Sequence, residues 1–223
     1  MKKTLFTTLS IISFSMTYAQ MINMNVNDQA NQAYLKVNSQ GSGKALAYEE
    51  ISGSPYINKN FSPAKVDNNI TVPIRYNSFR DDVEFQKDNS ILVLPKDANY
   101  SRIDIITPKQ TLVLLDTNDD LNGYFFEISG GKNALYKKVK TKFIDAVPAA
   151  NSFATEKPAT FRTLDPVYYI KTESGFIKNP KNIKEVTEQL PNQKDAIEAF
   201  SKTNKLKLSK EDDLIKLVQF LNK

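Results

Sequence analysis

The sequence predicts an α+β fold, in which a curved antiparallel β-sheet (a meander or half-barrel) is followed by three short C-terminal helices. From Lys44 to about Ile144, short runs rich in Val, Ile, Tyr and Phe alternate with turn residues at roughly ten-residue spacing, which is typical of antiparallel sheets. Near the C-terminus the spacing between apolar residues changes from two residues to about 3.6 residues, which is the period of an α-helix. We expect about eight to eleven strands.

Four segments follow from these patterns. They are a signal peptide (1–19), a loosely ordered N-terminal segment with one short strand near Tyr34 (20–43), a β-rich domain (44–177) and a helical C-terminal unit packed on it (178–223).

The first segment is typical of a secretory signal peptide. Lys2 and Lys3 precede a mostly apolar stretch that ends at Met16, and the small residues Thr17 and Ala19 suit a cleavage site. The stretch is much shorter than the roughly 20 residues of a membrane-spanning helix. We therefore expect cleavage after Ala19 and a periplasmic or secreted protein without a transmembrane segment.

The strands are predicted from short runs with high β-propensity: ALAYEEI, ITVPIRY, DVEF, SILVLP, RIDIIT, QTLVLL, YFFEIS, ALYKKVK and TKFI. Residues 145–166, with three prolines, are predicted to form a loop that runs over the sheet. The next run, VYYIKTESGFIKNP, predicts a hairpin in which Tyr168 and Tyr169 face opposite sides, one of them exposed or covered by the helices.

The three helices are predicted to begin at the N-caps Asn179, Asn192 and Ser209. Each is too short to be stable alone in water, so it must pack on the sheet or on its neighbours. Their apolar faces consist of Ile183, Val186, Leu190, Ile197, Phe200, Leu214, Leu217, Val218 and Leu221.

The run VPIRYNSFRDDVEF, residues 72–85, predicts a β-hairpin with a defined register. Ile74 lies opposite Phe85 on an apolar face, and Arg75 lies opposite Glu84 on the solvent side as a cross-strand ion pair. The turn between the strands is NSFRDD.

The same run leaves a carboxylate site as an alternative. Asp81, Asp82 and Glu84 are close in sequence, and glycosidases use two carboxyl groups about 5 Å apart or farther. Because a hairpin tip with three acids satisfies that spacing by chance, we favour the hairpin.

A second acidic run matches part of a calcium-loop template. Asp116, Asn118, Asp120 and Glu127 occupy positions 1, 3, 5 and 12, but Leu121 stands where the template needs Gly. The flanking runs also predict strands rather than helices. We therefore predict a polar turn between two strands.

Two further motifs are weak. Ser62 and Lys65 match the S-x-x-K pattern of penicillin-recognising enzymes, but the companion motifs are absent and the surroundings predict a loop rather than the helix that the pattern needs. The basic run Lys132–Lys142 would suit an anionic envelope surface. We interpret it instead as the solvated face of an edge strand.

The composition excludes several kinds of chemistry. The chain has no Cys and no His, so Ser-His-Asp and Cys-His catalysis are impossible, as are zinc sites built on Cys or His. Carboxylate, Ser-Lys or Tyr chemistry and calcium sites stay open. Cleavage would remove Lys2 and Lys3 and lower the formal net charge from +5 to +3, a balance that does not indicate a nucleic-acid partner.

Four runs resemble a group of exported proteins from Bacteroidota. They are GSPYINKNFSPAKV, VPIRYNSFRDDVEF, ALYKKVKTKF and FSKTNKLKLSKEDDLIKLVQFLN. Because proteins of this group are uncharacterised, the resemblance implies export but no reaction, and no catalytic residue follows from it.

We expect an exported, non-catalytic envelope or periplasmic protein that binds a protein partner or an envelope component. Two alternatives stay open: a small-ligand or lipid carrier with a cavity between sheet and helices, and a carboxylate-based hydrolase. An apolar cavity under the helices would favour the carrier. Two facing acids in a deep cleft would favour the hydrolase. We assign no catalytic residue, no cofactor and no metal ligand.

Overall fold

The computed structural model describes residues 35–66, 70–88, 90–151 and 153–223. The predicted signal peptide and most of the predicted loosely ordered segment lie outside the described residues. The described end of that segment contains β1 (Lys36–Ser39), which pairs with β2 (Lys44–Ala47) in a two-stranded sheet. The short strand predicted near Tyr34 therefore begins about two residues later than expected.

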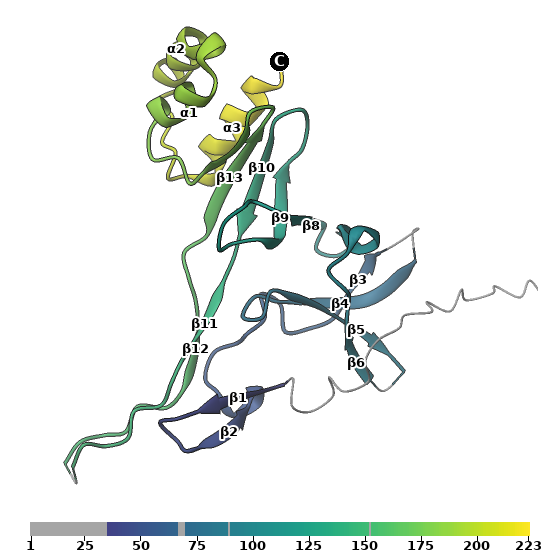
Figure 1. The fold of residues 1–223 in the computed structure, drawn as a ribbon, viewed down its shortest axis with the longest axis vertical. Helices are drawn as coiled ribbons and strands as arrows, with labels where there is room; N and C mark the ends of the chain where they lie inside the picture. The colour runs from purple at the N-terminus through teal and green to yellow at the C-terminus, as the bar shows by residue number, and fades with distance from the viewer. Residues whose placement is uncertain (1–34, 67–69, 89, 152) are drawn as a thin grey trace, which may run out of the picture.

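A ten-stranded antiparallel sheet is the largest sheet of the described chain (Figure 1). Its strand order is β14-β13-β10-β9-β8-β7-β3-β4-β5-β6. In chain order its strands are β3 (Ser62–Lys65), β4 (Thr71–Asn77), β5 (Asp82–Lys87), β6 (Ser90–Val93), β7 (Arg102–Ile105), β8 (Gln110–Leu115), β9 (Gly123–Ser129), β10 (Ala134–Lys138), β13 (Val167–Thr172) and β14 (Gly175–Lys178). The predicted class, a large curved antiparallel sheet followed by three helices, is confirmed.

In the curved part of the sheet formed by β3 to β9, side chains alternate between two faces, and one of these faces is buried. Ile74 and Phe85 lie opposite each other there, as the hairpin register predicts, and each is 1% exposed. The buried cluster on this face draws on strands from β3 to β9 and consists of Ala64, Val66, Ile74, Tyr76, Val83, Phe85, Leu92, Leu94, Tyr100, Ile103, Ile105, Leu112, Tyr124, Phe126 and Val139.

The three helices are α1 (Ile183–Gln189), α2 (Lys194–Asn204) and α3 (Glu211–Leu221). They cover one face of β10, β13 and β14, at the end of the molecule opposite β1 and β2 (Figure 1). The apolar residues of α3 are buried against the sheet as predicted. The shared cluster consists of Leu135, Ile170, Ile177, Val186, Ile197, Leu208, Leu214, Leu217, Val218 and Leu221.

The three predicted N-caps are wrong. Asn179 follows β14 and has a φ of 45°, outside the extended region that an N-cap adopts. Its backbone amide donates a hydrogen bond to the carbonyl of Tyr168 on β13. Asn182 caps α1 instead, by accepting a hydrogen bond from the backbone of Glu185. The other two helices begin after Gln193 and Lys210, neither of which makes a side-chain cap.

The opposite face of the same strands is covered by the acidic run rather than by a helix. Asp119 accepts hydrogen bonds from the hydroxyl of Tyr169 at 2.7 Å and from the ammonium of Lys178 at 2.9 Å. This pins residues 116–122 over an aromatic cluster in which Phe125 and Tyr169 meet edge to face at 5.1 Å. The loop therefore covers this aromatic cluster.

Residues 145–166 do not run over the sheet, contrary to the prediction. They include β12 (Thr160–Thr163), which pairs with β11 (Thr141–Ile144). β11 follows β10, and β12 leads into β13, so these two adjacent internal strands of the sheet extend into a two-stranded projection (Figure 1). We call residues 139–166 the arm.

Candidate functional site

The arm starts from a buried ion pair. Lys138 is 2% exposed, and its ammonium lies 2.6 Å from the carboxylate of Asp81 and 2.9 Å from the carbonyl oxygen of Tyr124. The same carboxylate accepts hydrogen bonds from the hydroxyl of Tyr76 and the amide of Tyr124. Burial lowers the pKa of Lys138, and Asp81 opposes that shift.

Backbone conformation makes room for this pair. Asp81 adopts a left-handed φ of 60° at the β4–β5 turn, which aims its side chain at β9 and β10. Gly123 has a φ of 128°, and a Cβ there would lie 1.7 Å from the carboxylate of Asp81. The position therefore requires glycine for both its conformation and its space.

The basic run is consequently not the solvated face of an edge strand. β10 lies between β9 and β13 and is therefore an internal strand of the large sheet. Lys137 bonds Glu211 of α3 at 2.8 Å, and Lys132 pairs with Glu173 at 2.9 Å. Together with the pair of Lys138 and Asp81, these contacts give three members of the run a partner inside the protein.

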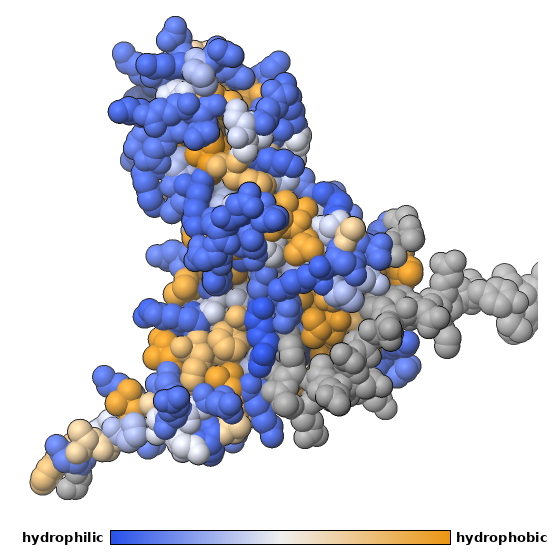
Figure 2. All heavy atoms as spheres, in the orientation of Figure 1, coloured by the Kyte–Doolittle hydropathy of each residue, from blue (hydrophilic) through white to orange (hydrophobic). Residues whose placement is uncertain are grey.

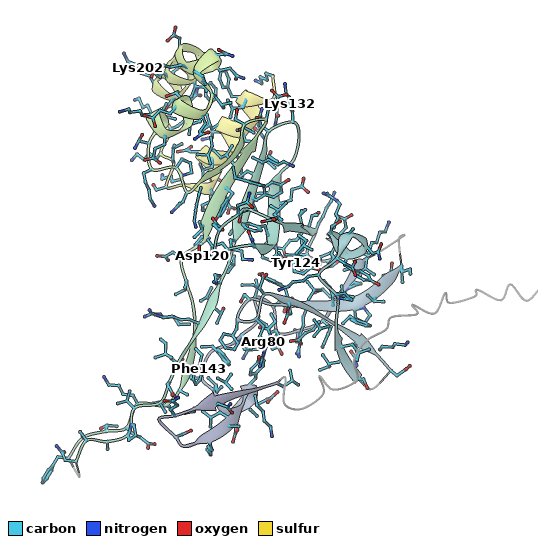
Figure 3. All side chains as sticks on the ribbon, viewed as in Figure 1. Arg80, Asp120, Tyr124, Lys132, Phe143 and Lys202 are labelled. Carbon is cyan, nitrogen blue, oxygen red and sulfur yellow. The ribbon has the colours of Figure 1, made fainter. Side chains whose placement is uncertain are left out.

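The base of the arm is packed against the β4–β5 turn. The hydroxyls of Ser78 and Thr141 are 2.7 Å apart, and Phe79 contacts Phe161 of β12 with ring centroids 5.2 Å apart. Tyr48 meets Phe161 edge to face at 5.3 Å. Figure 3 labels Arg80, next to these turn residues, and Phe143 of β11 in the same region. These contacts fix the direction in which the arm leaves the body.

The β1–β2 sheet supports the arm from the same side. Asp145 accepts hydrogen bonds from the hydroxyl of Ser39 at 2.5 Å and from the amides of Gln40 and Gly41. These bonds lower the pKa of Asp145. This carboxylate therefore has a structural role and is not available to a ligand.

The other face of the arm carries cations. Lys142 lies directly opposite Arg162, and both side chains are exposed. By alternation the same face holds Lys140, whose carbonyl accepts a bond from the amide of Leu164. None of its described positions is acidic: they are Lys140, Lys142, Ile144, Thr160, Arg162 and Leu164. We call these six residues the outward face.

The far end of the arm is apolar. Val147 and Lys157 exchange two backbone hydrogen bonds, which close the last part of the ribbon. Beyond them Phe153 is 99% exposed, and Val147 itself is 54% exposed. Figure 2 shows apolar side chains at this projecting end of the molecule. Aromatic residues, Phe included, are enriched in protein interfaces relative to the rest of the protein surface.

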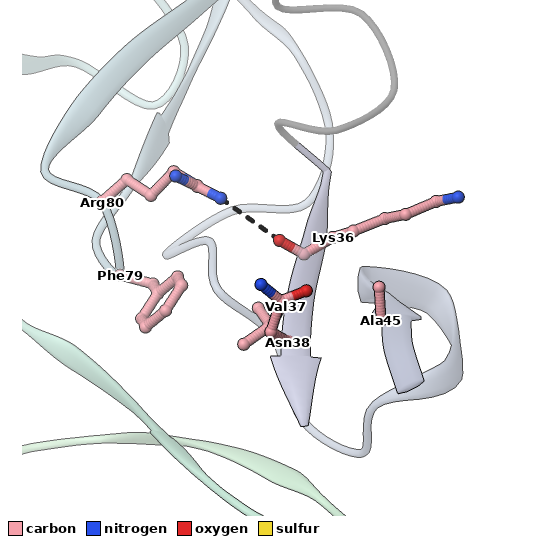
Figure 4. Close-up of a pocket in the computed structure, with 6 residues that line it drawn as sticks. All are labelled: Lys36, Val37, Asn38, Ala45, Phe79 and Arg80. Carbon is pink, nitrogen blue, oxygen red and sulfur yellow. Dashed lines mark hydrogen bonds between the residues drawn. The ribbon is translucent and has the colours of Figure 1, made fainter. Parts of the chain in front are cut away.

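A pocket of about 570 Å³ lies beside the base of the arm, between β1 and the β4–β5 turn (Figure 4). Arg80 donates hydrogen bonds to the hydroxyl of Tyr48 and to the carbonyl of Lys36, so its guanidinium holds β1 in place. The lining residues are Lys36, Val37, Asn38, Ala45, Phe79 and Arg80. Cations beside apolar side chains would suit an anionic group, but the pocket holds no pair of facing acids.

Each acid of the predicted hairpin is paired with a cation: Glu84 with Arg75, Asp81 with Lys138 and Lys96, and Asp82 with Lys96. Glu84 is fully buried and is bound by Arg75 and Asn77, whereas Asp81 points to Lys138. The placement of Glu84 on the solvent side was wrong, because Tyr56 and Phe61 stack on Arg75 and cover this face. The register of the pair itself, Arg75 opposite Glu84, is confirmed.

The residues of the calcium-loop template are dispersed. Asp116 accepts a hydrogen bond from the amide of Asn118, while Glu127 lies on β9 and pairs with Arg102. The predicted polar turn between two strands is confirmed, with β8 and β9 as the strands. Among the described residues, no group of three or more acids is placed to hold a metal ion.

The S-x-x-K match lies on a strand. Ser62 and Lys65 are the ends of β3, so the predicted loop is wrong at this point. Residues three apart on a strand point to opposite faces, which separates the hydroxyl from the amine. The pattern therefore carries no Ser-Lys chemistry here.

No protein-family model, curated protein or solved structure matches this chain. In the described part of the chain, none of the helices has the length and apolar character needed to cross a membrane.

Neither the arm nor the pair of Lys138 and Asp81 is predicted from the sequence. One signal was present in ALYKK, where alternation puts Ala134, Tyr136 and Lys138 on the same face. A lysine that points to the same face as an alanine and a tyrosine, on a strand with neighbours on both sides, is a candidate for burial.

Proposed function

We propose that this protein is exported and acts as a non-catalytic binding protein of the cell envelope, with the arm as its contact with a partner. The observation that carries this proposal is Phe153, an aromatic residue that is 99% exposed at the end of a two-stranded projection. Exposed aromatic residues are frequent energetic centres of protein interfaces, because a partner's pocket removes them from water.

The rest of the molecule supports a binding role over the two alternatives. The sheet under the helices is packed by one continuous apolar cluster, which favours a rigid support over a carrier. The acids that a hydrolase would need are paired with Arg75, Lys138 and Lys96. The body of the protein is then a scaffold that holds the arm.

Export is tested by the N-terminus of the mature protein. We expect the protein recovered from the periplasm or medium to begin at Gln20, because Lys2, Lys3 and the apolar stretch before Ala19 form a signal-peptide pattern. N-terminal sequencing of the native protein measures this. Cytoplasmic protein that retains Met1 would contradict export.

The binding role is tested by site-specific photocrosslinking in the cells that make the protein. With p-benzoylphenylalanine in place of Phe153 in the full chain, we expect one dominant adduct, because the apex would lie inside the partner. The control places the same probe at Lys202, on α2 at the opposite end of the molecule (Figure 3). Absence of an adduct from position 153, or equal adducts from both positions, would contradict the proposal.

A further inference from the structure

We infer that the arm binds an acidic protein surface, with Phe153 as an apolar anchor at the far end and with Lys142 and Arg162 as charged contacts along the outward face. This inference rests on the proposed binding function and specifies the chemistry of the partner. It is carried by the way in which cations are distributed over the molecule.

The cations of the outward face oppose the stability of the arm. Like charges directly opposite each other on paired strands are destabilising, and Lys142 faces Arg162 in this way. No ion pair within the described residues compensates either of them. By contrast, Lys137 and Lys138 on the adjoining strand each have an internal acid. Stability of the isolated protein therefore does not explain the two cations on the arm.

Charge complementarity supplies an explanation. A partner that presents carboxylates would remove the repulsion between Lys142 and Arg162 and would be attracted to the outward face before contact. Leu164, at 37% exposed, adds apolar area on the same face. An aromatic anchor with charged residues at its periphery is the usual arrangement of a specific protein interface.

The length of the arm favours a protein over a lipid bilayer. An extended strand rises about 3.3 Å per residue, which puts Arg162 roughly 30 Å along the arm from Phe153. Exposed charges are largely screened beyond about 8–10 Å at physiological salt. A flat bilayer that took up Phe153 would meet Glu156 and Lys157, whose charges cancel. A protein lying along the arm would contact both the apex and the cations.

The test uses the full chain with the photocrosslinking probe at position 153 in an envelope extract, and mass spectrometry identifies the captured peptide. We expect a segment rich in Asp and Glu, and an adduct that decreases when salt is raised. Arg162→Glu should lower the yield roughly tenfold, because it puts an acid against the partner's acids. Lys202→Glu, which changes the same charge at the other end of the molecule, should leave the yield unchanged.

The melting temperature of Arg162→Glu shows whether a lower adduct yield comes from loss of folding or from loss of binding. Arg162→Glu converts the repulsive cross-strand pair into an attractive one with Lys142, so its melting temperature should equal or exceed that of the wild type. A variant that melts higher yet captures less partner would support the inference.

Three outcomes would overturn the inference while leaving a binding role intact. They are an adduct insensitive to Arg162→Glu and salt, a captured segment without acidic residues, and a lipid adduct together with flotation on phosphatidylglycerol vesicles. Absence of any adduct from position 153 would instead refute the proposed function itself.

Discussion

Asp81→Ala is expected to lower the free energy of unfolding by about 3–5 kcal/mol, because it leaves the ammonium of Lys138 buried without its counter-ion. The carboxylate also accepts hydrogen bonds from the hydroxyl of Tyr76 and the amide of Tyr124, which would lose their acceptor. Denaturant unfolding measures the change. The control is Asp104→Ala, whose side chain is 51% exposed and pairs with Arg102, and which should cost about 0–1 kcal/mol.

A double variant distinguishes the stability lost through the buried charge from the stability lost through a changed turn. Adding Lys138→Met to Asp81→Ala removes the uncompensated ammonium and should recover part of the loss, since an apolar side chain of similar length fills the site. A double variant less stable than Asp81→Ala would show that the turn, rather than the ion pair, accounts for the effect.

The loss caused by Asp81→Ala should shrink as the pH rises toward 10.5, the ordinary pKa of lysine. Burial lowers the pKa of Lys138 in the folded protein, and removal of Asp81 lowers it further. Between the folded and unfolded pKa values the unfolded chain binds more protons, so the free energy of unfolding rises with pH in that window. A loss that is constant with pH would contradict a lowered pKa of Lys138 in the variant.

Arg75→Ala is expected to cost about 3–5 kcal/mol, far more than the exposed pair predicted from the sequence would cost. Glu84 is fully buried, and the guanidinium of Arg75 contacts its carboxylate at 2.7 Å. The guanidinium also stacks on Tyr56 at 3.9 Å, so its removal leaves a buried charge and an open space.

The matched control is Arg162→Ala, which removes an exposed arginine from a strand that has no acid opposite it. It should change the free energy of unfolding by no more than about 0.5 kcal/mol. Arg75→Lys should lie between the two, because lysine keeps the charge but loses the planar contact with carboxylate and ring. A cost below about 1 kcal/mol for Arg75→Ala would place Glu84 in contact with water.

The hairpin shows how far alternation predicts this fold. The period of two in residues 72–85 gave the register of Ile74 with Phe85 and of Arg75 with Glu84. It did not give the burial of Glu84, because alternation separates two faces without stating what covers each. That cover comes from Tyr56 and other residues earlier in the chain.

The arm could not be predicted because its strands are specified by contacts between distant segments and not by local sequence. Prolines and small residues in 145–166 are typical of a loop, and the strand Thr160–Thr163 is too short to stand out by composition. Its pairing with β11 follows from the position of β10 beside β13 in the sheet. The burial of Lys138 likewise depends on an acid 57 residues away.

The continuity of the arm with β10 and β13 has a mechanical consequence. A partner that pulled on Phe153 would load these two strands along their length, against β9 on one side and β14 on the other. The hydrogen bonds of antiparallel strands run perpendicular to that direction, so they would resist the force together in shear rather than one at a time. Through Leu135 and Ile170 the load would also reach the helices. We therefore expect the arm to resist tension along its length.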